Sequence, residues 1–150
     1  MQRNIIPGIV REQEIVALDK SSSVHDAVQA MSNHRIAAIA VTDNATGKLV
    51  GIVSERDMTH RVLACGLNPQ STPLSDVMTE NPTTLRSGDD ALDAVELMLV
   101  RNFRHLPVVN ESGIVIAMVS MRDLLKAALI DLKIDLDVIQ EAAFASEESD

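Results

Sequence analysis

The fold is decided by a short stretch that occurs twice, as Asp26-Ala27-Val28-Gln29-Ala30-Met31 and later as Asp93-Ala94-Val95-Glu96-Leu97-Met98. Two further matches follow in the same order, with one residue lost between them. They pair Ile39-Ala40-Val41 with Leu106-Pro107-Val108, and Ser54-Glu55-Arg56-Asp57 with Ser120-Met121-Arg122-Asp123. Three matches in order indicate an internal duplication, which determines the architecture.

Each copy has the same order of predicted elements. Extended runs at residues 14–18 and 82–85 come first, and small polar residues then open a helix. Apolar residues in each helix recur at i, i+3, i+4 and i+7, the spacing of one buried face. They are Val24, Ala27, Val28 and Met31, then Ala91, Ala94, Val95 and Met98. Two strands joined by a turn and a final helix complete a β-α-β-β-α pattern, so the predicted fold class is α/β (α+β).

The copies are separated by a turn-rich linker. We expect a first repeat with its N-terminal segment at residues 1–66, a linker with a short helical turn at 67–81, a second repeat with the C-terminal helix at 82–145, and a disordered acidic tail at 146–150. Each copy holds about 60 residues, a size at which a single core is marginal alone. The two sheets are therefore expected to pack together about a pseudo-twofold axis.

Composition argues against several classes of function. The 150 residues carry a formal net charge of −9 and contain no Trp or Tyr, which disfavours nucleic-acid binding. No apolar run is long enough for a membrane helix, and the N-terminus lacks a secretory signal. The usual glycine-rich phosphate loops and metal-ligand spacings are also missing. We therefore expect a cytoplasmic protein that is not an enzyme, holds no metal and binds neither membranes nor nucleic acids.

The repeated Ser-x-Arg-Asp element lies where a strand leads into a helix, and it has two interpretations. Serine followed three residues later by aspartate fits a capping box, worth about 1 kcal/mol per helix. The same helix N-terminus presents free N–H groups and a positive dipole end that suit an anionic ligand. Ser54 and Asp57 in the first copy, and Ser120 and Asp123 in the second, are candidates for both roles.

A basic pair precedes the buried strand of the second copy. Arg104 and His105 could converge on a phosphate, or could face solvent and cap the preceding helix. The matching residues of the first copy, Ala37 and Ala38, can do neither. We therefore predict that the cleft of the second copy binds a phosphorylated ligand more tightly.

These residues resemble the tandem CBS domain, or Bateman module, named after cystathionine β-synthase. The resemblance covers residues 14 to about 130 and rests on the duplicated Asp-Ala-Val-x-x-Met, on residues 104–109 and on residues 51–57. It implies a disc-like pair with two clefts that bind adenosine-containing ligands: AMP, ADP, ATP, NAD or S-adenosylmethionine. It also implies a stand-alone homodimeric sensor that regulates a partner protein in trans, with AMP as the favoured ligand. The alternative is a ligand-free dimerisation scaffold in which the Ser-x-Arg-Asp elements are only helix caps.

The resemblance assigns ligand-binding roles to individual residues. Aspartates would bind ribose hydroxyls, serines and basic residues would bind phosphate, and the first strands would line the adenine pockets. The residues carried over are Ser54, Asp57, Ser120, Asp123, Arg104, His105, Arg56, Arg122, Thr83, Thr84, Val16, Ala17 and Ala38. The second copy departs from the family pattern at Ala117, where the first copy has the family's glycine, Gly51.

A long helix without Pro or Gly is predicted from Met121 to Ala143. Two apolar rows run along nearly opposite faces of it. One row is Leu125, Leu129, Leu132, Leu136, Ile139 and Ala143, and the other is Ile130, Ile134 and Val138. The first row has the spacing of a coiled-coil seam. We expect one row to pack on the helix's own domain and the other on a partner subunit, so the sequence predicts a homodimer.

Overall fold

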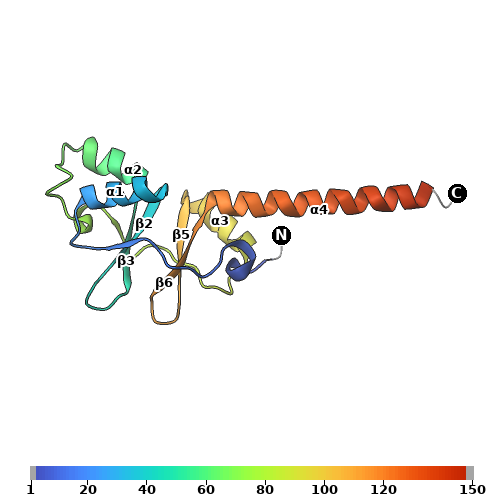
Figure 1. Cartoon of the computed structure of the whole chain (residues 1–150), viewed down its shortest axis with the longest axis horizontal. Coiled ribbons are helices and arrows are strands. Elements are labelled where there is room, and N and C mark those ends of the chain that lie inside the picture. Colours follow the sequence, from blue (N-terminus) through green and yellow to red (C-terminus); the bar gives the residue numbers. More distant parts are fainter. Residues whose placement is uncertain (1–2, 148–150) are drawn as a thin grey trace.

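The computed structural model describes residues 3–147, which form two similar halves and a helix that projects away from them (Figure 1). The strands are β1 (Ala17–Asp19), β2 (Ala38–Thr42), β3 (Leu49–Ser54), β4 (Thr79–Glu80), β5 (His105–Val109) and β6 (Val115–Ser120). The helices are α1 (Val24–His34), α2 (Glu55–Asp57) with its π-helical continuation (Met58–Leu63), α3 (Ala91–Arg101) and α4 (Met121–Glu147). Short helical turns occupy Ile5–Ile9 and Leu74–Asp76. This order confirms the predicted mixed fold in two copies.

The first repeat contains a four-stranded sheet in the order β1-β2-β3-β4. β1 runs parallel to β2, and the other neighbours are antiparallel. α1 begins at a capping box, in which the Ser23 hydroxyl accepts from the Asp26 N–H and the Asp26 carboxylate accepts from the Ser23 N–H. The first strand lies later than predicted, because only Ala17–Asp19 pair with β2.

The second repeat forms a two-stranded antiparallel sheet, β5-β6. The strand predicted at residues 82–85 does not form. Its last residue, Leu85, makes only an isolated parallel bridge to β5, donating to the Pro107 carbonyl at 2.9 Å. Residues 84–86 are the equivalents of β1, and among them only Leu85 pairs with β5.

The segment that precedes each repeat in the sequence packs against the other repeat. The Ile5 N–H donates to the Asp89 carbonyl of the second repeat at 2.9 Å, and the Leu74 N–H donates to the Ser22 carbonyl of the first at 2.8 Å. The two contacts are equivalent in the duplication. Residues 72–80, within the predicted linker, therefore pack as part of the first repeat, and β4 lies among them and pairs with β3.

Ile5 and Leu74 anchor these crossing segments in two separate hydrophobic cores. Both side chains are fully buried, Ile5 among residues of the second repeat such as Leu106, and Leu74 among residues of the first such as Ile39. Each core thus takes an anchor from the segment that leads into the other repeat. This arrangement fits the expectation that a repeat of this size does not complete its core alone.

α4 packs on the second repeat only near its start. Its buried residues are Leu124 and Ala127, and an ion pair joins Asp131 to Arg3. Beyond that point the helix extends away from both repeats (Figure 1). It continues to Glu147, so residues 146–147, expected in a disordered tail, are helical. Residues 148–150 of that tail lie outside the described residues.

Both predicted apolar rows of α4 are exposed. Leu132 of the first row is 56% exposed, and Ile134 of the second row is 53% exposed. The expectation that one row packs on the helix's own domain is wrong, because the helix leaves the domain before either row can be covered.

Candidate functional site

Two clefts open between the repeats, and each contains one Ser-x-Arg-Asp element. The first cleft has a volume of about 390 Å³ and lies between residues 54–57 of the first repeat and residues 102–105 of the second. The second cleft, about 550 Å³, lies between residues 120–123 and residues of the first repeat that include Val16 and Ala38. Each cleft therefore combines the strand-to-helix junction of one repeat with segments that lead into strands of the other.

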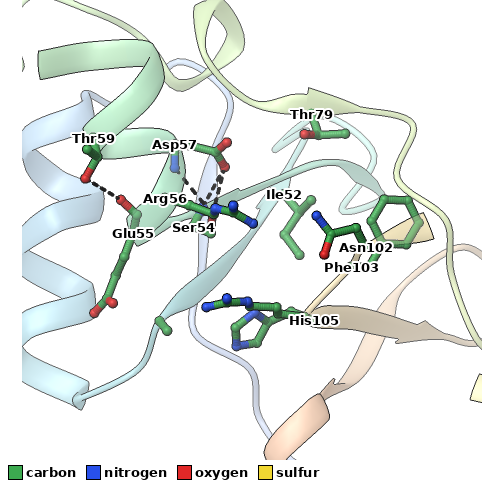
Figure 2. Close-up of a pocket in the computed structure, with 12 residues that line it drawn as sticks. Ile52, Ser54, Glu55, Arg56, Asp57, Thr59, Thr79, Asn102, Phe103 and His105 are labelled. Atoms are coloured by element: carbon green, nitrogen blue, oxygen red, sulfur yellow. Dashed lines mark hydrogen bonds between the residues drawn. The ribbon is translucent and has the colours of Figure 1, made fainter. Parts of the chain in front are cut away.

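In the first cleft, Ser54 and Asp57 form a complete capping box at the start of α2 (Figure 2). The Asp57 carboxylate accepts from the Ser54 N–H at 2.8 Å and from its hydroxyl at 3.2 Å, while Ser54 Oγ accepts from the Asp57 N–H at 3.4 Å. The other carboxylate oxygen of Asp57 lies 3.4 Å from Arg61 Nε. Arg61 also donates to the carbonyls of Val77 and Met78, so Asp57 is held by an arginine that is itself fixed.

In the second cleft, Ser120 and Asp123 repeat this arrangement at the start of α4. The Asp123 carboxylate accepts from the Ser120 N–H at 2.8 Å and from its hydroxyl at 2.9 Å. Ala127 stands where the first repeat has Arg61, and within residues 3–147 Asp123 has no ion pair. One carboxylate oxygen of Asp123 is therefore free to accept from a ligand. In both repeats the element caps a helix and lines a cleft at the same time.

Arg104 and His105, at the start of β5, line both clefts. They were expected to belong to the second cleft alone, but β5 begins where the two clefts meet, so the pair does not distinguish them. Figure 2 shows His105 on the side of the first cleft opposite Ser54. The Arg104 guanidinium has no hydrogen bond or ion pair within the part of the chain that the structure describes.

Burial lowers the pKa of His105 from its ordinary value of 6.5, and the Arg104 charge acts in the same direction. Asp123 in the second cleft and Glu55 in the first oppose this shift of the pKa. His105 is therefore neutral at pH 7 and can both donate and accept a hydrogen bond at the junction of the clefts.

The other predicted residues divide into two groups. Those that line a cleft are Arg56 in the first, and Arg122, Val16 and Ala38 in the second. Those that line neither are Thr83, Thr84 and Ala17. The two threonines fall in the strand that does not form, and Thr79 of β4 lines the first cleft instead. Ala17 is exposed.

Sequence reasoning missed a matched pair at two helix C-termini. Arg35 ends α1 and lines the second cleft, whereas Asn102 ends α3 and lines the first. Both residues are left-handed, with φ of 53° and 56°. The duplication aligns them, and that alignment was the available signal. Glu14 and Glu55 were also missed, and they add a carboxylate to the second and first clefts respectively.

Within 3–147, no group of three or more His, Cys, Asp or Glu side chains is placed to hold a metal ion. No helix in this range has the length and apolar character that crossing a membrane requires. The polar side chains that line the clefts carry guanidinium, carboxylate, hydroxyl and imidazole groups.

Known proteins with the same sequence pattern and fold are CBS-domain proteins. The chain is 38% identical over 120 residues to the CBS domain-containing protein CBSCBSPB2 of Arabidopsis thaliana, covering 80% of this chain and 22% of that one. The CBS domain protein PAE2072 of Pyrobaculum aerophilum, solved with AMP, has a TM-score of 0.70 at 26% identity, covering 79% of this chain and 94% of that one. CBSX2, also solved with AMP, has a TM-score of 0.65 at 27% identity, covering 78% and 89%.

The chain spans about a fifth of the length of the plant relative but most of each AMP-bound structure. The family model for the CBS domain matches residues 5–64 and 74–130. These two matches begin at Ile5 and Leu74, the equivalent residues that anchor the crossing segments. The chain therefore belongs to the CBS-domain family and carries two CBS domains in tandem.

Proposed function

We propose that the protein is a cytoplasmic regulatory module that binds adenine nucleotides in the clefts between its two CBS domains and controls a partner protein in trans. The observation that carries the proposal is the duplicated Ser-x-Arg-Asp element, which places a fixed carboxylate and a guanidinium beside each cleft. Two related structures contain AMP, which supports the ligand class. The proposed role is binding, without catalysis.

The side chains of the clefts match the parts of a nucleotide. Asp123 is already fixed by two hydrogen bonds, so its free lone pairs can accept from ribose hydroxyls with little further ordering. Guanidinium groups bind phosphate oxygens through paired, charge-assisted hydrogen bonds. Cleft volumes of about 390 and 550 Å³ fall within the roughly 300–1,000 Å³ of small-molecule sites.

Titration calorimetry tests this proposal. AMP, ADP, ATP, NAD and S-adenosylmethionine are titrated separately into the full chain, and at least one adenine nucleotide is expected to bind. The Asp123→Asn variant keeps the size of the side chain but not its charge, and it is expected to bind more weakly while melting at nearly the same temperature. Silence from all five compounds would favour the ligand-free scaffold.

We further propose that α4 joins two copies of the chain into a homodimer. A helix with apolar residues on both faces is stable when both are covered, and an isolated helix is marginal in water. The first row has the spacing of a self-complementary coiled coil. Burying the three branched side chains of the second row, Ile130, Ile134 and Val138, could contribute on the order of 5 kcal/mol per subunit before the costs of association.

Sedimentation distinguishes the contributions of the two rows. The Ile134→Asp/Val138→Asp variant disrupts the second row, and Leu132→Asp/Leu136→Asp disrupts the first. We expect a dimeric parent at micromolar concentration and a monomer from at least one variant. A monomeric parent, or two variants that both stay dimeric, would count against α4 as the interface.

A further inference from the structure

We propose that the two clefts select different phosphate chains, the second binding the di- or triphosphate of an adenine nucleotide and the first the monophosphate, with Arg35 as the residue that sets this specificity. The inference rests on the proposed nucleotide binding and adds which nucleotide each cleft takes. It follows from a comparison of matched positions in the two repeats.

Arg35 and Asn102 occupy the same place in the fold. Each ends the first long helix of its repeat, and its N–H donates to a carbonyl of the last helical turn, that of Met31 or Met98. Each has a left-handed backbone and lies just before a central strand, β2 or β5. Because each cleft combines parts of both repeats, Arg35 reaches the second cleft and Asn102 the first.

The exchange of Arg for Asn changes the charge of the clefts. The second cleft is lined by three arginines, Arg35, Arg104 and Arg122, against the carboxylates of Glu14 and Asp123. None of these arginines has an ion pair or a side-chain hydrogen bond to another residue in the range 3–147. Three arginines that line one cavity without an ion pair suit a ligand with more than one phosphate, because each guanidinium can bind a phosphate through two hydrogen bonds.

The first cleft is lined by fewer arginines. Arg56 and Arg104 line it together with Glu55 and Asp57, and Asp57 is already paired with Arg61, which does not line the cleft. Figure 2 shows Glu55 and Arg56 on α2 and Asn102 across the cleft from them. Its volume is also smaller, about 390 Å³ against 550 Å³. A ligand with fewer phosphates fits this smaller number of arginines and this size better.

A purely structural role for Arg35 is the stabilisation of the C-terminal end of α1 by a positive charge. That role requires a cation near the helix end and predicts no preference among AMP, ADP and ATP. Arg35→Lys keeps the charge but loses the planar fork, so it separates the two roles.

The test measures each cleft alone by calorimetry with AMP, ADP and ATP in buffer without magnesium. Asp57→Ala weakens the first cleft and leaves the second to be measured, and Asp123→Ala does the reverse. In the Asp57→Ala background we expect ATP to bind about tenfold or more tightly than AMP, and Arg35→Asn to remove that preference. In the Asp123→Ala background we expect Asn102→Arg to create a preference for ATP.

These substitutions suit the backbone at both positions. Asn tolerates a left-handed conformation, and Arg already occupies one in the equivalent place. A preference for ATP that survives Arg35→Asn, or that is absent from the second cleft of the parent, would overturn the inference and leave nucleotide binding intact. No binding by any of the three nucleotides would overturn the proposed function and this inference with it.

Discussion

The two repeats share a backbone plan but hold their cleft carboxylates differently. Arg61 ties Asp57 and also fixes the chain just before β4, whereas Ala127 in the same position leaves one oxygen of Asp123 free. The duplication therefore supplies one geometry twice. Under the proposed function, the few positions where the repeats differ would decide what each copy binds, while the shared motif provides the framework.

The largest effect on stability is expected at Ile5 and Leu74, the equivalent residues that anchor the two crossing segments. Ile5→Ala and Leu74→Ala should each lower the free energy of unfolding by about 2–5 kcal/mol, because both side chains are fully buried and their removal leaves a cavity. Urea denaturation followed by circular dichroism measures both values. A loss below about 1 kcal/mol for only one of them would show that its segment is dispensable and that the halves are not equivalent.

Removing the cleft carboxylates should separate the two sites. Asp123→Ala is expected to weaken AMP binding in the second cleft by about tenfold or more, since a charge-assisted hydrogen bond contributes roughly 1.5–3 kcal/mol. Asp57→Ala should cost less in the first cleft, because Arg61 already engages one oxygen of Asp57. Calorimetry with AMP compares them, and equal losses would contradict the difference drawn between the repeats.

Substitution of His105 tests the environment of a residue that lines both clefts. Because its pKa is lowered in the folded protein, the unfolded chain takes up a proton first as the pH falls below 6.5, so this residue reduces stability in that window. His105→Gln removes the contribution. Between about pH 7.5 and about pH 5.5, the Tm of the variant is therefore expected to fall less than that of the parent. An identical slope in both proteins would show that the His105 environment does not favour the neutral form.

The smallest effect is expected at two surface contacts to matching positions of the repeats, Asp43 and Asn110. Lys20 Nζ lies 2.9 Å from Asp43 Oδ2 in the first repeat, and Arg86 Nη1 donates to the Asn110 carbonyl at 2.6 Å in the second. Lys20→Ala and Arg86→Ala should each lower Tm only marginally, because exposed contacts of this kind contribute little. High salt screens the ion pair, so the effect of Lys20→Ala on Tm should disappear at a lower salt concentration than the effect of Arg86→Ala. A large change in Tm at either position would show that its contact contributes more than an exposed contact does.

Features that depend on neighbouring residues could be predicted from the sequence. The capping boxes at Ser54 and Ser120 involve a partner three residues away, and the helical faces follow from a spacing of three and four. The length of α4 follows from a run without Pro or Gly. In each case the interacting groups lie within about one helical turn of each other.

Features that depend on distant residues could not be predicted in the same way. Nothing near Ile5 shows that it packs on the second repeat, because its partner Asp89 is remote in the chain. The same limit explains why Arg104 was assigned to one cleft, since only the packing of the repeats shows that β5 begins at both. Arg35 was missed because an arginine at a helix end is ordinary until the opposite repeat forms a cavity beside it.

Asp123 lies in the first turn of α4, so a movement of this residue in the second cleft would also tilt the helix. At a rise of 1.5 Å per residue, its 27 residues form a rod about 40 Å long. A tilt of about 5° at the capped end would move the far end by about 3.5 Å over that length. Because most of the rod touches neither repeat, the repeats would not resist this displacement. A small adjustment around a ligand in the second cleft would thus be enlarged at the tip of α4, at a distance where another protein could detect it.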